Sequence, residues 1–236
     1  MNAETKKRIA LVTGASRGIG RAVAVELARG GWHVIAVARA QKALEKLDDS
    51  IRAAGGEATL IPLDLRDGAA IDQLAAPLLE RFAQLDGLAA CAGALGSLTP
   101  AHQATPAIMD ETIAVNFLAN QRLIRALHPL LRESDAGRAV FLTSGASRNP
   151  HAYWAPYAAS KAALDALVLS YAAELSVTRI KANLFNPGPT RTSMRQKAFP
   201  GEDPMTLPAP EEVAPAIVKM LAPDYQENGA WVQFER

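Results

Sequence analysis

Six short, almost continuously apolar segments recur along the chain, and longer segments with helical spacing separate them. The apolar segments are residues 8–14, 33–39, 58–64, 87–93, 138–144 and 180–188. Strands that helices cover on both faces have this character, whereas half-exposed strands alternate apolar and polar residues. Because the strands alternate with helices, right-handed crossovers and a doubly wound sheet are expected.

The segments between the strands complete this prediction. Ile19, Ala22, Val23 and Leu27 recur at helical spacing, and Gly30-Gly31 is a typical helix end. Pro77 starts or kinks another predicted helix, and a last strand around residues 230–234 would be the seventh. We therefore predict one Rossmann-like α/β domain over residues 1–236, with a mostly parallel seven-stranded sheet and helices on both faces.

Charge and composition restrict the partners and the compartment. The 25 basic and 24 acidic residues give a formal net charge of +1, so we expect neither nucleic acid nor a membrane surface as a partner. No apolar run approaches the roughly 20 residues that span a bilayer, and no apolar leader precedes the first motif. A single cysteine, Cys91, excludes an internal disulfide and fits a reducing compartment. These features predict a cytoplasmic protein.

The stretch TGASRGIG, Thr13 to Gly20, joins the first strand to the first helix. Its glycines differ in spacing from the usual G-x-G-x-x-G fingerprint. In this setting they allow a tight turn, a close approach to a pyrophosphate and close helix packing, and the helix N-terminus attracts phosphate. The alternative is an ordinary turn that uses glycine for geometry alone. The predicted cofactor contacts here are Gly14, Ser16, Arg17, Gly18, Ile19 and Gly20.

The end of the second strand indicates which dinucleotide binds. Enzymes that prefer NAD carry a carboxylate there for the ribose hydroxyls, but this strand ends Val37-Ala38-Arg39. Arg39 and Arg17 suit a 2′-phosphate through charge-assisted hydrogen bonds, unless both are simply solvated surface arginines. We predict NADP(H) as the preferred cofactor, with NAD(H) as the alternative.

A second motif, YAASK, places Tyr157 and Lys161 one helical turn apart. Ionising a tyrosine at pH 7 takes about 4 kcal/mol, and an ammonium ~4 Å away at an effective dielectric of ~20 supplies about that much. Such a pair is also common on solvated helices. Here Ser144 lies thirteen residues upstream at a strand end, and Asn116 is polar within an apolar helical pattern. Active sites of open α/β sheets form at these strand ends.

Together these residues resemble the short-chain dehydrogenase/reductase family, and within it a bacterial subgroup of oxidoreductases without a settled substrate. TGASRGIG resembles the family loop T-G-x-x-x-G-x-G, and PGPTRT resembles its P-G-x-x-x-T cofactor motif. Asn116, Ser144, Tyr157 and Lys161 match its catalytic tetrad in order and spacing. The resemblance adds these cofactor contacts: Asp64, Leu65, Ala92, Gly93, Tyr157, Lys161, Pro187, Gly188, Thr190 and Thr192.

The resemblance also implies roles. Tyr157 would be the general acid in carbonyl reduction and the base in alcohol oxidation, and Lys161 would lower its pKa and hold the nicotinamide ribose. Ser144 would position the substrate carbonyl, and Asn116 would hold a water in a proton relay through Lys161. The chain departs from the family where Ala90-Cys91-Ala92-Gly93 replaces Asn-Asn-Ala-Gly, so we expect a modest effect on cofactor affinity.

The substrate side is predicted from segments beyond the strand ends. These are residues 95–100, 148–154 and 194–207, of which the last has the mixed apolar and charged character of a lid. Arg191, Arg195 and Lys197 either recognise an anionic substrate or form a solvated basic cluster. The histidines show no metal-ligand spacing, and with one cysteine we predict no metal site.

The predicted function is interconversion of a small-molecule carbonyl and a secondary alcohol by an NADP(H)-dependent oxidoreductase. The alternative is a catalytically weak NADP(H)-binding sensor or scaffold of the same fold. Helical segments 108–131 and 155–177 carry small or apolar stripes, which are either core or an interface. Because the family pairs these helices in its oligomers, we expect a homodimer or homotetramer, although the C-terminus lacks the family's usual glycine-rich ending.

Overall fold

The computed structural model describes residues 7–235; residues 1–6, where we expect no targeting signal, and residue 236 lie outside them. Over the described residues, seven strands form one sheet in the order β3-β2-β1-β4-β5-β6-β7, and every strand pairing is parallel. The strands are β1 (Ile9–Thr13), β2 (His33–Ala38), β3 (Glu57–Pro62), β4 (Gly87–Ala90), β5 (Arg138–Leu142), β6 (Lys181–Asn186) and β7 (Trp231–Gln233). The predicted fold class is thus confirmed, and the sheet is fully rather than mostly parallel.

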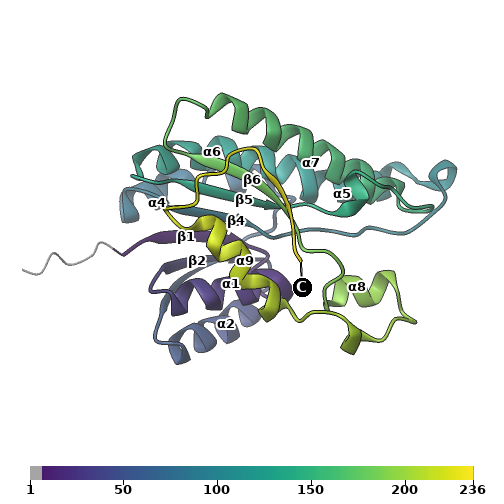
Figure 1. Cartoon of the computed structure of the whole chain (residues 1–236), viewed down its shortest axis with the longest axis horizontal. Helices are drawn as coiled ribbons and strands as arrows, with labels where there is room; N and C mark the ends of the chain where they lie inside the picture. The colour runs from purple at the N-terminus through teal and green to yellow at the C-terminus, as the bar shows by residue number, and fades with distance from the viewer. Residues whose placement is uncertain (1–6, 236) are drawn as a thin grey trace, which may run out of the picture.

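The helices cover both faces of the sheet, as the doubly wound prediction requires. Across residues 7–235 they are α1 (Gly18–Arg29), α2 (Gln41–Ala53), α3 (Gly68–Asp72), α4 (Ala75–Phe82), α5 (Pro106–Ile113), α6 (Ala119–Glu133), α7 (Ala155–Glu174), α8 (Ser193–Ala198) and α9 (Pro210–Leu221). Figure 1 shows α1, α2 and α9 on one face and α4, α6 and α7 on the other. The helix α8 lies apart from both layers, beyond the ends of the strands.

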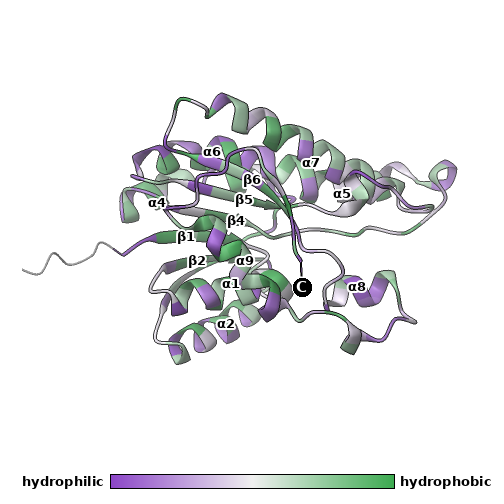
Figure 2. Ribbon diagram, viewed as in Figure 1, coloured by the Kyte–Doolittle hydropathy of each residue, from purple (hydrophilic) through white to green (hydrophobic). Residues whose placement is uncertain are grey.

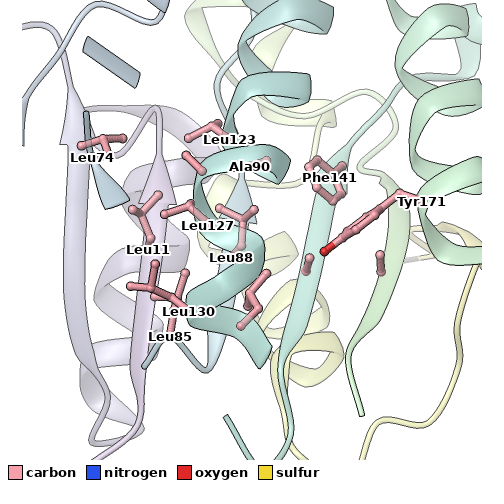
Figure 3. Packing of buried hydrophobic residues seen from close by; sticks show 14 of the residues in the cluster. Leu11, Leu74, Leu85, Leu88, Ala90, Leu123, Leu127, Leu130, Phe141 and Tyr171 are labelled. Carbon is pink, nitrogen blue, oxygen red and sulfur yellow. The ribbon is translucent and has the colours of Figure 1, made fainter. Parts of the chain in front are cut away.

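Alternate residues of each strand enter two separate hydrophobic cores. In β1, Leu11 packs with α4 and α6 residues, whereas Val12 packs with α1 and α9 residues. Figure 3 shows the first core, where Leu127 of α6 lies over Leu88 of β4. The central strands are apolar along their length, and the helices present hydrophilic residues outward (Figure 2). This two-sided burial explains why the strands read as continuous apolar runs.

One predicted helix differs from the structure in a way that affects the site. The segment 108–131 is interrupted by a π-helical turn at Ala114–Leu118, between α5 and α6. Single π turns inside α-helices are rare and often occur at functional sites. Asn116 lies in this turn and is fully buried. Pro77 lies in the first turn of α4, so it helps to start that helix.

Among the described residues, no helix has the length and apolar character needed to cross a membrane.

Candidate active site

A cavity of about 570 Å³ runs along the carboxyl ends of the strands. The loop after β1, the ends of β2 and β5, the segments after β3, β4 and β6, and α7 supply its walls. The predicted residues that line it are Gly14, Ser16, Arg17, Gly18, Ile19, Gly20, Arg39, Asp64, Leu65, Ala92, Gly93, Tyr157, Lys161, Pro187 and Thr192. The predicted residues outside this lining are Asn116, Ser144, Gly188 and Thr190.

The glycine loop at one side of the cavity has the geometry that close backbone packing requires. Gly14 has a φ of +66°, in the region that favours glycine. A Cβ at Gly20 would lie 2.5 Å from the carbonyl oxygen of Gly14, so the first turn of α1 packs directly on the loop. No side chain caps α1, and its first turn has no acidic residue. The amides at this helix end can therefore take an anionic ligand.

At the end of the cavity near β2 and β3, cationic side chains dominate. Arg17 and Arg39 are exposed and line the cavity. Asp64 accepts hydrogen bonds from the Arg66 guanidinium, with Nη2 2.5 Å from Oδ2 and Nε 3.1 Å from Oδ1. This bidentate contact holds the pKa of the Asp64 carboxyl below its usual value. The sequence did not lead us to predict Arg66 as part of the site, although an arginine two residues after Asp64 is placed to pair with that carboxylate.

Tyr157 and Lys161 lie in the first two turns of α7 and are both buried. Burial raises the pKa of Tyr157, and a hydrogen bond with Ser144 opposes this rise. Burial lowers the pKa of Lys161 to about 8, while Asp165 opposes the fall. The Lys161 ammonium donates to the carbonyl oxygen of Leu142 at 2.7 Å. Tyr157 is therefore protonated at neutral pH in this arrangement, which suits a proton donor.

Ser144 follows β5 and begins the short 3₁₀ turn at Gly145–Ser147. Its Oγ accepts a hydrogen bond from the Ala146 amide at 3.2 Å, which fixes the side chain against the turn. Ser144 is also near enough to Tyr157 to oppose the rise in the pKa of that phenol, so the fold brings these two predicted catalytic residues together.

The buried Asn116 is held in place by hydrogen bonds to its neighbours. Its amide side chain bonds both the N–H and the carbonyl of Ala94 at 2.8 Å, and donates to Ser160 Oγ at 2.8 Å. The carbonyl of Asn116 accepts from Asn120 Nδ2 at 2.9 Å. A Cβ at Gly93 would lie 3.4 Å from Asn116 Oδ1 and 3.8 Å from Lys161 Nζ. Asn116 thus holds the segment at Gly93 and Ala94, which lies between its own side chain and that of Lys161.

The motif after β6 closes the cavity, which Pro187 and Thr192 line and Gly188 and Thr190 do not. Thr192 lines the cavity and caps α8 by accepting from the Arg195 amide at 3.2 Å. Thr190 is buried, and its hydroxyl lies within 3.3 Å of the carbonyl oxygens of Pro187 and Gly188. Its hydroxyl therefore stabilises the turn itself, rather than facing the cavity.

The predicted lid is packed against the N-terminal end of α7 by apolar and aromatic contacts. The Trp154 ring lies 5.8 Å from the Tyr157 ring and 5.6 Å from the Phe199 ring. Arg195 donates to Glu202 from Nε and Nη2, each at 2.6 Å, and its guanidinium lies 3.8 Å from the Phe199 ring centroid. Arg195, a predicted candidate for binding an anionic substrate, is thus paired with Glu202 and Phe199 within the predicted lid.

The remaining candidates bear on reactive or metal chemistry. Burial raises the pKa of the Cys91 thiol to about 12, so the thiol beside the cavity is protonated and unreactive at neutral pH. Within residues 7–235, no three His, Cys, Asp or Glu side chains are placed to hold a metal ion. The lining of the cavity also includes residues that the sequence did not predict, among them Glu111 of α5 and Val115 of the π turn.

Comparisons with known proteins agree with this geometry. A family profile described as short chain dehydrogenase matches residues 8–203. The chain belongs to the short-chain dehydrogenase family. Members of this family are oxidoreductases, so the chain is an enzyme that acts on CH–OH donors. The helix α9 and strand β7 lie beyond the matched residues and complete the same sheet.

Individual relatives give the range of this similarity. The uncharacterized oxidoreductase YciK of Escherichia coli K12 is 38% identical over 220 residues, which cover 92% of this chain and 87% of that protein. A 2,3-dihydro-2,3-dihydroxybenzoate dehydrogenase of Bacillus subtilis is 34% identical, with 86% and 78% covered. A short chain dehydrogenase of Escherichia coli CFT073, solved in complex with NADPH, has a TM-score of 0.92 at 37% identity, with 96% and 95% covered.

Proposed function

We propose that the chain is an NADP(H)-dependent oxidoreductase that interconverts a carbonyl and a secondary alcohol by hydride transfer. One observation carries this proposal: Tyr157 and Lys161 line the same cavity as the glycine loop. A nicotinamide dinucleotide extends from a phosphate-binding loop to the reacting carbon, and one continuous cavity offers room for both ends.

The residues around the cavity fit such a cofactor. The uncapped N-terminus of α1 suits a pyrophosphate, and Gly14 leaves its side of the loop without a side chain. Arg17 and Arg39 suit a 2′-phosphate, and the end of β2 has no carboxylate to repel it. Solved relatives bound to NADP and to NADPH support the same cofactor. The bound cofactor would supply the hydride.

The side chains of this site would handle the proton. Tyr157, whose pKa burial raises, would donate its phenolic proton to the carbonyl oxygen in reduction. Ser144 would share a hydrogen bond with the same oxygen and so fix its position. Lys161 would hold a ribose hydroxyl and, once it leaves the Leu142 carbonyl, assist proton delivery to Tyr157.

The proposal extends to the whole chain. We infer that residues 1–236 form a single domain and that the protein assembles as a homodimer or homotetramer. We also infer that it works in the cytoplasm, since a chain with one cysteine suits a reducing compartment. The second candidate, an NADP(H)-binding sensor or scaffold, would need no proton donor, and the buried Tyr157 and Lys161 on the wall of the cavity favour the enzyme over it.

The test compares binding with turnover. NADPH should bind with a change in its fluorescence, and the protein should reduce members of a panel of aldehydes, ketones, β-ketoacyl thioesters and sugars. Tyr157→Phe should lower the reduction rate by about 10²–10⁴-fold and leave NADPH affinity within a few-fold. Tight NADPH binding without turnover across the panel would favour the sensor or scaffold.

A further inference from the structure

A buried acid that the proposed reaction does not use lies directly behind the catalytic residues. Asp165 follows Lys161 by one turn on α7 and is 8% exposed. Its carboxylate accepts hydrogen bonds from Thr143 Oγ1, from Ser147 Oγ at 2.6 Å and from Trp231 Nε1 at 3.1 Å. The three donors come from the end of β5, from the turn after it and from β7. Three donors on one buried carboxylate form a rigid network.

Two of these donors flank Ser144. Thr143 precedes it directly, and Ser147 ends the 3₁₀ turn that Ser144 begins. Ser147 Oγ also lies 2.8 Å from the carbonyl oxygen of Ser144, so the same hydroxyl touches the serine backbone and the Asp165 carboxylate. The carboxylate therefore ties both sides of the turn that presents Ser144 to the helix that presents Tyr157 and Lys161.

Asp165 also places a negative charge near a buried cation. Lys161 is 3% exposed, and its ammonium contacts a carbonyl rather than a carboxylate. The other titratable side chains around it are Tyr157 on the same helix and Cys91 after β4, and both are neutral at pH 7. Asp165 is the acid whose charge raises the pKa of Lys161 against the effect of burial.

The far side of Asp165 is closed by an aromatic ring. The Trp231 indole that donates to Asp165 is covered by the Arg148 guanidinium, 4.0 Å from the ring centroid. The carboxylate bonds the edge of the indole, the arginine lies over its face, and the hydroxyls of Thr143 and Ser147 are neutral. Lys161 is the cation that shares the helix and the buried site with Asp165.

We propose that Asp165 is a positioning residue of the active site, which fixes the Ser144 turn through Thr143 and Ser147 and supplies a buried negative charge one helical turn from Lys161. This inference rests on the proposed function for its effect on turnover. Its effect on Lys161 is independent of any substrate.

The test removes the charge and keeps the shape. In Asp165→Asn, the side-chain oxygen can still accept from Ser147 and Trp231, and the hydroxyl of Thr143 can turn to accept from the new amide. Lys161 is followed by NMR in protein with ¹³C-labelled lysine, and its signal is assigned by its loss in Lys161→Met. We expect its titration to move to lower pH by about one unit in Asp165→Asn.

Turnover is measured on the same variants with NADPH and phenanthrenequinone or an aromatic aldehyde. Asp165→Asn should lower kcat by about 10–100-fold, since a small displacement of Ser144 misaligns the carbonyl, and leave the NADPH dissociation constant within about three-fold. Asp165→Glu should restore the Lys161 titration but not the full kcat, because the longer side chain displaces the turn. Asp49→Asn, at an exposed acid on α2, is the matched control and should change neither quantity.

An unchanged Lys161 titration together with a kcat within two-fold of wild type would overturn the proposal. If Asp165→Asn does not fold, Ser147→Ala replaces it as the test variant. We expect Ser147→Ala to lower kcat about five-fold and to leave the Lys161 titration unaltered. An unaltered kcat in Ser147→Ala would also overturn the proposal. A wild-type protein that reduces no carbonyl would refute the proposed function, while the Lys161 titration would still report on Asp165.

Discussion

At the scale of single residues, Arg39 is the side chain that we propose as the determinant of cofactor choice. It is exposed at the end of β2 and lines the cavity, where NAD-preferring enzymes carry an acid. Charge-assisted hydrogen bonds to a 2′-phosphate contribute about 1.5–3 kcal/mol. We therefore expect Arg39→Ala to weaken NADPH binding by about 10–100-fold and to leave NADH binding nearly unchanged. Fluorescence titration with both cofactors measures this, and an unaltered ratio of the two affinities would reject the assignment.

Lys161 gives a second prediction at this scale, because burial of its charged form lowers the stability of the fold. Its pKa falls from 10.5 to about 8 on folding, a net effect that already includes the attraction of Asp165. Between these values the unfolded chain binds more protons than the folded chain, so this group makes the protein more stable as the pH rises. Below pH 8 the destabilisation is present in full.

Lys161→Met removes the buried charge and keeps most of the side-chain volume. We expect the free energy of unfolding at pH 7 to rise by about 1–3 kcal/mol while activity is lost. The gain should shrink as the pH approaches 10.5. Urea denaturation at pH 7 and pH 10 measures both effects, with Lys46→Met, an exposed lysine on α2, as the control. A variant less stable than wild type at pH 7 would contradict the prediction.

At the scale of elements, the junction between β1 and α1 depends on Gly20. A methyl group there would lie 2.5 Å from the Gly14 carbonyl oxygen and 3.0 Å from that of Thr13, and both obstacles are backbone atoms. Gly20→Ala should therefore shift α1 away from the loop, lower the free energy of unfolding by about 1–3 kcal/mol and weaken NADPH binding. Gly201→Ala is the matched control, because its Cβ would meet no atom within 4 Å. Thermal denaturation and NADPH titration test this, and a wild-type-like Gly20→Ala would show that the packing is looser than described.

The same elements show what local sequence could predict. The strands lie within a few residues of the predicted segments, because burial on both faces leaves an apolar run that is easy to read. The predicted strand at residues 87–93 was too long by three residues, because β4 ends at Ala90. Beyond this point the chain runs along the cavity, and its residues are still small and apolar. Glycine spacing and the YAASK motif located the site for the same reason, since each motif lies within one turn or loop.

The features that were missed are made by contacts between distant segments. In the sequence, Asp165 is one acidic residue within a predicted helix. Its three hydrogen-bond donors come from the end of β5, the following turn and β7, which are distant along the chain or belong to other elements. The side chain of Asn116, in the π turn, bonds to residues that lie 22 and 44 positions away. Periodicity along one segment carries no information on such partners, so the sequence predicted one regular helix over 108–131.

At the scale of the whole molecule, α6 and α7 lie side by side on one face of the sheet (Figure 1). On this face Leu118 and Leu169 are 46% and 40% exposed, although most large apolar side chains in residues 7–235 are buried. A stable interface covers about 800 Å² on each partner and often centres on such side chains. We therefore expect a second copy of the chain to cover this face in solution.

Leu169→Glu tests that assembly, because two-fold symmetry would bury a pair of uncompensated charges in the interface. The wild-type protein should have the mass of a dimer or tetramer by light scattering, and Leu169→Glu should dissociate it at least in part. Leu79→Glu changes a similarly exposed leucine on α4, 46% against 40% for Leu169, and should keep the wild-type mass. Because α7 carries Tyr157 and Lys161 near its N-terminus, dissociation should also lower kcat more than NADPH affinity. A monomeric wild-type protein would exclude the assembly. A Leu169→Glu variant with unaltered mass would place the interface on another face.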